Sequence, residues 1–76
     1  MPSSIERLGQ VLKQYRERLG LSQELLAAHS GLNRTFIGEI ERGETNPSFE
    51  TLVILASTLQ VPLSEVISVY ERMERG

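Results

Sequence analysis

The segment from Ser22 to Gly43 constrains the fold more than any other part of this 76-residue chain. Ser22 and Asn33 each precede a short apolar pattern, and their side chains can accept the backbone N–H groups that a helix N-terminus leaves free. Gly31 lies between the two patterns, where a left-handed backbone costs glycine little. Gly43 ends the second pattern. We therefore predict two short helices joined by a tight turn.

The two predicted helices must pack closely, because the turn between them is short. Ala27 provides the small side chain that a close contact needs, and the apolar contacts would come from Leu26, Ile37 and Ile40. The exposed face of the second helix is then expected to carry Arg34, Thr35, Gly38 and Glu39. This is the arrangement of a helix-turn-helix, in which the second helix enters the major groove of DNA.

Apolar residues at three- and four-residue intervals predict further helices on both sides of this unit. One precedes it, from Ser3 to Gly20, and two follow it, beginning at Ser48 and Pro62. The fourth helix should form the floor of the core through Phe49, Leu52, Val53, Leu55, Ala56 and Leu59. Residues 1–76 are thus predicted to form one all-α domain of five helices, with an aliphatic core because only 5% of the residues are aromatic.

The first predicted helix carries two local features. Ser3 and Glu6 have the spacing of a capping box, in which each side chain bonds the other residue's free backbone N–H. Gly9 weakens a helix by about 1 kcal/mol relative to alanine, so we expect it to allow the close approach of another segment.

Composition excludes several classes of function. The chain has no cysteine and no aspartate, and it has one histidine. Disulfides, thiolate metal sites and a set of catalytic acid, base and nucleophile are therefore not expected, and we predict no enzyme, no metal and no cofactor. No apolar run approaches the length of a membrane span, and the N-terminus lacks the apolar region of a signal peptide. We expect a cytoplasmic protein without a membrane partner or a small-molecule ligand.

The net charge of −2 is unevenly distributed along the chain. Residues 1–47 hold six basic residues and six glutamates, whereas residues 48–76 hold two arginines and four glutamates. The acidity thus lies in the C-terminal part. This distribution is compatible with DNA binding through the predicted helix-turn-helix, but not with a broad, non-specific electrostatic attraction to DNA.

The spacing of several residues resembles the Cro/repressor-type (XRE-like) helix-turn-helix family. Five position types agree in register: Gln23, Ala27, Gly31, Ile37 and Ile40. The resemblance implies a lambda-repressor-like domain and covers nearly the whole chain. It also implies that Arg16 pairs with Glu41 and so locks the first helix to the third.

Within that family, the triplet Arg34, Thr35 and Phe36 is similar to the controller proteins of restriction–modification systems, although general XRE-type repressors and antitoxins can share it. The resemblance implies a sequence-specific transcriptional regulator. Two other functions stay open: an antitoxin that binds a second protein, and an adaptor that uses the same helices for protein contacts only.

The predicted DNA contacts fall into two groups. Arg34 is the best candidate for base contact, since a guanidinium can donate two hydrogen bonds to O6 and N7 of guanine. The residues expected near the bases are Arg34, Thr35, Phe36, Gly38 and Glu39. The residues expected at phosphates are Gln23, Asn33, Arg42, Thr45, Asn46 and Ser48. Phe36 is expected to be partly exposed.

The fifth predicted helix has more apolar residues than one inward face requires. We place Leu63 and Ile67 toward the core, which leaves a second apolar strip exposed to water. A two-fold dimer would bury such a strip twice. Residues 62–76 are therefore predicted to contribute a homodimer interface made of Val66, Val69, Tyr70 and Met73, and the two recognition helices would then contact a palindromic operator.

Overall fold

Five α-helices make up the fold in the computed structural model, which describes residues 2–75. They are α1 (Ser4–Arg18), α2 (Gln23–Ser30), α3 (Arg34–Glu41), α4 (Phe49–Thr58) and α5 (Leu63–Arg75). No strand occurs among the described residues. The predicted all-α fold with five helices is confirmed.

The helix starts follow from local side-chain chemistry. The Ser3 hydroxyl accepts the Glu6 N–H at 3.1 Å, and the Glu6 carboxylate accepts the Ser3 N–H at 2.8 Å, so the predicted capping box is present. Ser22 caps α2 and Asn33 caps α3, as predicted. The left-handed turn between these helices is at Gly31, whose φ is 76°.

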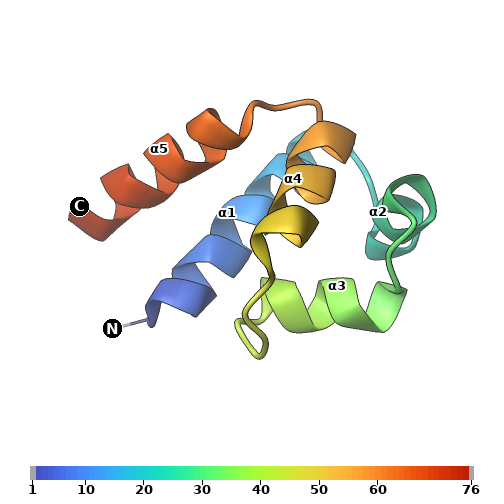
Figure 1. The fold of residues 1–76 in the computed structure, drawn as a ribbon, viewed down its shortest axis with the longest axis horizontal. Helices are drawn as coiled ribbons and strands as arrows, with labels where there is room; N and C mark the ends of the chain where they lie inside the picture. Colours follow the sequence, from blue (N-terminus) through green and yellow to red (C-terminus); the bar gives the residue numbers. More distant parts are fainter. Residues whose placement is uncertain (1, 76) are drawn as a thin grey trace.

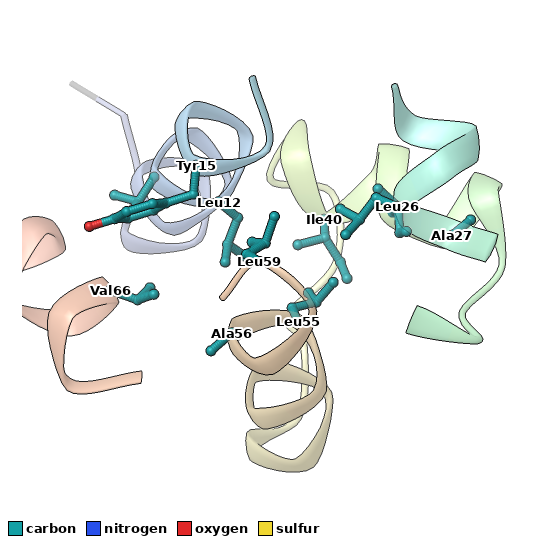
Figure 2. Packing of buried hydrophobic residues seen from close by; sticks show 11 residues of the cluster. Leu12, Tyr15, Leu26, Ala27, Ile40, Leu55, Ala56, Leu59 and Val66 are labelled. Carbon is teal, nitrogen blue, oxygen red and sulfur yellow. The ribbon is translucent and has the colours of Figure 1, made fainter. Parts of the chain in front are cut away.

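The helices surround one core (Figure 1). α1 and α4 lie in the middle, α5 lies on one side of them, and α2 and α3 lie on the other. Buried apolar side chains from all five helices meet between them, as Figure 2 shows. The core residues are Val11, Leu12, Tyr15, Leu26, Ala27, Ile37, Ile40, Leu55, Ala56, Leu59 and Val66.

The prediction for α4 is wrong at two of its apolar residues. α4 buries Leu55 and Ala56, and Leu59 is buried directly after it, but Phe49 is 72% exposed and Val53 is also exposed. Val53 lies about 100° around the helix from the centre of the buried face, which is too far to reach the core. Phe49 is the first residue of α4 and belongs to the turn that leads into the helix from the surface loop.

The prediction for α5 is right at Leu63, which packs against the core, but wrong at Val66 and Ile67. Val66 is fully buried in the core, whereas Ile67 is 39% exposed. Val69, Tyr70 and Met73 are half-buried against the same core as Val66. Val66 therefore cannot form a dimer interface, because its side chain is already covered by its own chain.

No single helix among residues 2–75 is long and apolar enough to cross a membrane. Only α4 and α5 taken together reach the length and apolar composition of a membrane span, and the chain bends by 104° between them.

Candidate nucleic-acid interface

α3 is held against the rest of the domain along one side and faces outward on the other. Ile37 and Ile40 are buried in the core, while Arg34 and Thr35 are exposed. The Asn33 side-chain oxygen accepts the backbone N–H groups of Thr35 at 2.7 Å and of Phe36 at 3.3 Å, and these hydrogen bonds fix the first turn. The first turn of α3 thus presents its polar side chains on a backbone capped by Asn33.

Gly9 allows α1 to cross α3 at close range. A Cβ atom placed on Gly9 would collide with the backbone carbonyl oxygens of Ile40 and Glu41. The predicted close approach at this glycine is confirmed. It brings the C-terminal end of α3 directly onto α1.

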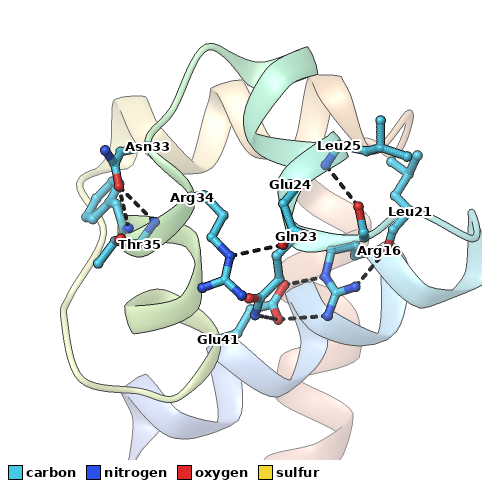
Figure 3. Close-up of polar contacts among 11 residues, drawn as sticks. Arg16, Leu21, Gln23, Glu24, Leu25, Asn33, Arg34, Thr35 and Glu41 are labelled. Atoms are coloured by element: carbon cyan, nitrogen blue, oxygen red, sulfur yellow. Dashed lines mark hydrogen bonds and ion pairs between the residues drawn. The ribbon is translucent and has the colours of Figure 1, made fainter.

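A buried polar network then fixes this end of α3 (Figure 3). Arg16 Nε donates to Glu41 Oε2 at 2.6 Å and Nη2 donates to Oε1 at 2.9 Å, which confirms the predicted pair. Arg16 Nη1 also donates to the Leu21 carbonyl oxygen at 2.7 Å. The hydrogen bonds to Glu41 raise the pKa of Arg16 above its ordinary value, so this guanidinium stays charged.

Gln23 joins the same network, which sequence reasoning did not anticipate. Its side-chain nitrogen donates to Glu41 Oε1 at 2.9 Å. Glu41 thereby receives hydrogen bonds from α1 and α2 while it belongs to α3. Gln23 has a structural partner inside the protein, and its predicted phosphate contact stays a prediction.

The expected exposure of Gly38 is wrong. Gly38 is buried, because the Arg42 side chain lies over it, and a Cβ at Gly38 would come within 2.9 Å of Arg42 Nη1. Residues four apart lie on one helix face, so an arginine at this distance can cover the glycine. Phe36 is partly buried as predicted, and Glu39 is partly rather than fully exposed.

Arg34 is exposed and bonded to a glutamate of the neighbouring helix. Its Nε donates to Glu24 Oε1 at 3.0 Å, which links the first turn of α2 to the first residue of α3. This hydrogen bond lowers the pKa of Glu24 below its ordinary value. The partner was not anticipated from the sequence, because the two residues belong to different helices.

Arg42 is also paired, but in a different geometry. Its Nε and Nη2 donate to the two carboxylate oxygens of Glu44, at 2.9 and 3.0 Å. These hydrogen bonds raise the pKa of Arg42 and lower the pKa of Glu44. Both side chains are more than half exposed, so this pair contributes little to stability.

The other predicted phosphate contacts lie around the start of α4. Ser48 caps α4, since its Oγ accepts the Thr51 N–H at 3.1 Å. Thr45 is half-buried and Asn46 is exposed, both in the loop between α3 and α4. Asn46 also lines a pocket with residues of α1 and α5, so the structure does not gather all the predicted residues at α3, and their contacts with DNA stay predictions.

No group of three or more metal-binding side chains occurs in the part of the chain that the structure describes. The arrangement instead offers hydrogen-bond donors on a protruding helix. Such a surface fits a groove lined with base edges and phosphates.

Comparison with known proteins gives consistent results. The helix-turn-helix family HTH_3 matches residues 12–66. The control protein C.SmaI of Serratia marcescens is 43% identical over 63 residues, which cover 83% of this chain and 75% of that protein. Other relatives are longer proteins described as HTH-type transcriptional regulators. The chain spans about half of their length or less.

Solved structures show the same fold. The restriction–modification controller protein C.AhdI of Aeromonas hydrophila superposes with a TM-score of 0.79 at 40% identity, over 82% of this chain and 94% of that one. The controller protein C.Esp1396I, solved as a tetramer with its natural 35 base-pair operator, superposes with a TM-score of 0.86 at 28% identity, over 95% of each chain.

Proposed function

The chain belongs to the helix-turn-helix family HTH_3. We therefore propose that it is a sequence-specific transcriptional regulator that binds a palindromic operator as a homodimer. The observation that carries this proposal is the position of α3. Its C-terminal end is fixed by the Arg16–Glu41 pair, and its first turn presents Arg34 and Thr35 to solvent. A helix held in this way can enter the major groove without first becoming ordered.

Among such regulators, we propose a controller of a restriction–modification system. C.AhdI is a restriction–modification controller protein and C.SmaI is a control protein, and each is at least 40% identical to the chain over more than four-fifths of its length. A controller acts on DNA inside the cell, so we place the protein in the cytoplasm.

Of the residues predicted for the homodimer interface, Val66 is excluded by its burial, so we look for exposed apolar side chains beside it. Phe49 and Val53 lie one turn apart on α4 and are exposed, and so is Ile67 on the adjacent α5. Next to Ile67 is an open pocket of about 270 Å³, lined by Ser4, Ile5, Leu8, Asn46, Ile67 and Tyr70.

We assign the dimer contact to this surface, Phe49, Val53 and Ile67. A second copy related by a two-fold axis would bury these apolar side chains twice in one interface. Two α3 helices held by such a dimer would contact half-sites about 34 Å apart, one turn of the duplex. The tetramer of C.Esp1396I on its operator supports binding of DNA by more than one copy of the chain.

Selection of bound sequences from a random DNA pool tests the function. The wild-type protein should enrich one palindromic motif that contains a guanine in each half-site. The R34A variant should remain helical and lose the enrichment, because its base-contacting guanidinium is gone. A folded wild-type protein that enriches no shared motif at low salt would overturn the proposal.

A further inference from the structure

The two arginines predicted to contact DNA are bonded to glutamates in different ways. Arg42 uses Nε and Nη2 together on Glu44. Arg34 uses only Nε, on Glu24 (Figure 3). Within the described part of the chain, neither terminal nitrogen of Arg34 has a hydrogen-bond partner. The end of the Arg34 guanidinium is therefore available to a ligand while its inner edge is held.

The available atoms match one base edge. Nη1 and Nη2 each carry N–H donors that point away from the side chain in parallel, a geometry that fits two acceptors side by side. Guanine presents O6 and N7 in this way in the major groove. With Nε occupied by Glu24, the end-on approach is the one that leaves the existing hydrogen bond intact.

The hydrogen-bond partner of Arg34 comes from the helix-turn-helix itself. Glu24 lies in the first turn of α2, and Arg34 is the first residue of α3. The two helices pack against each other, and Ala27 and Ile37 are buried in the same core. The packing therefore fixes the backbone positions of Glu24 and Arg34 relative to each other, while their side chains, 69% and 54% exposed, are held by their own hydrogen bond.

We propose that Glu24 is a positioning residue for DNA recognition, one that holds Arg34 through Nε so that both terminal nitrogens contact one guanine end-on. This inference rests on the proposed function of the chain. It gives Glu24 opposite effects on two kinds of DNA. The exposed carboxylate repels phosphates of every sequence, but its hydrogen bond favours only a site with a guanine in the correct place.

The experiment separates the hydrogen bond of Glu24 from its charge. Two duplexes are compared. The first is the operator that the wild-type protein enriches. The second has the same sequence, but 7-deazaguanine replaces the guanine that R34A no longer selects. Dissociation constants for both duplexes and for an unrelated duplex are measured for the wild type, E24A and E24Q. E71A is the control, since Glu71 is an exposed glutamate on α5 that forms no ion pair among the described residues.

The expected pattern differs between the variants. E24A should bind the unrelated duplex more tightly, and its preference for guanine over 7-deazaguanine should fall roughly two- to tenfold, because the Arg34 side chain is no longer held before binding. E24Q should also bind the unrelated duplex more tightly, but it should keep the guanine preference, since its amide oxygen can still accept the Nε–H. E71A should preserve the guanine preference.

Two results would overturn the inference. In one, folded E24A keeps the full guanine preference, so Glu24 does not position Arg34. In the other, E24Q loses the preference as E24A does, so charge and not the hydrogen bond is responsible. Either result leaves the proposed function standing, whereas failure of the wild-type protein to enrich any motif would remove the function itself.

Discussion

Arg16 on α1 and Glu41 on α3 form an ion pair through two hydrogen bonds, and each residue is only 8% exposed. Breaking one partner of a buried pair leaves the other charge without compensation, at a cost of about 3–5 kcal/mol. We therefore expect R16A to lower the free energy of unfolding by about this amount. Denaturation by urea, followed by circular dichroism, measures the change.

The control for R16A is K13A, which removes an exposed positive charge from the same helix. Its unfolding free energy should stay within about 0.5 kcal/mol of the wild type. Unchanged stability of R16A together with weaker DNA binding would show that Arg16 acts on DNA and not on the packing of α3.

Gly9 and Gly38 offer a matched pair of glycine-to-alanine substitutions in helices. A Cβ at Gly9 meets backbone oxygens that cannot move, whereas a Cβ at Gly38 meets only the end of the exposed Arg42 side chain. G9A should be destabilised by at least about 1–3 kcal/mol through overpacking. G38A should be neutral or stabilised by up to about 1 kcal/mol, because alanine favours the helix and Arg42 can move aside. Equal melting temperatures for the two variants would contradict this explanation.

The parts of the fold that local chemistry decides could be predicted from the sequence. Ser3 and Glu6 determine the start of α1 by their own hydrogen bonds, and Gly31 determines the turn by its backbone freedom. The Arg16–Glu41 pair required more, namely a resemblance to proteins with the same helix order. The helix start and the turn each depend on one or two residues, so the sequence alone predicts them.

The orientation of α5 could not be predicted, because its apolar residues cover more than one face. Val66 and Ile67 are adjacent in sequence and both apolar, yet only Val66 is buried. Helical periodicity defines the strips but not which strip meets the core, and that choice depends on the angle at which α5 packs on α1 and α4.

In the candidate site, the ion-pair partners of the side chains could not be predicted from the sequence. Arg34 and Arg42 could be selected as exposed donors, but their partners depend on rotamers. Glu24 is ten residues before Arg34, so no helical spacing connects them. Gly38 was expected on the surface for the same reason, since only the conformation of the Arg42 side chain covers it.

Ionisation of Tyr15 should lower the free energy of unfolding at alkaline pH. Its hydroxyl donates to Glu65 Oε2 at 2.7 Å, and burial followed by this hydrogen bond raises the pKa of Tyr15 above its ordinary value near 10. The folded state therefore holds the proton more tightly than the unfolded state. Stability is fully present below pH 10 and decreases as the pH rises through the raised pKa, because the unfolded chain releases the proton first.

The Y15F variant tests this pH dependence. At neutral pH it should lose about 1 kcal/mol with the hydrogen bond to Glu65. Above pH 10 its stability should decline less steeply than that of the wild type, since the titrating group is absent. Parallel declines for the two proteins would show that Tyr15 does not contribute to the alkaline transition.

Substitutions on α4 and α5 should separate the dimer surface from the core. V66A removes a fully buried side chain and should cost roughly 2 kcal/mol of unfolding free energy. F49A changes a largely exposed side chain, so the unfolding free energy of the monomer should change by less than about 0.5 kcal/mol, whereas I67A truncates a side chain that is 39% exposed and should cost about 1 kcal/mol. Both should instead shift the sedimentation coefficient at micromolar concentration from dimer to monomer. A wild-type monomer under these conditions, or an unchanged dimer in F49A and I67A, would exclude this surface as the interface.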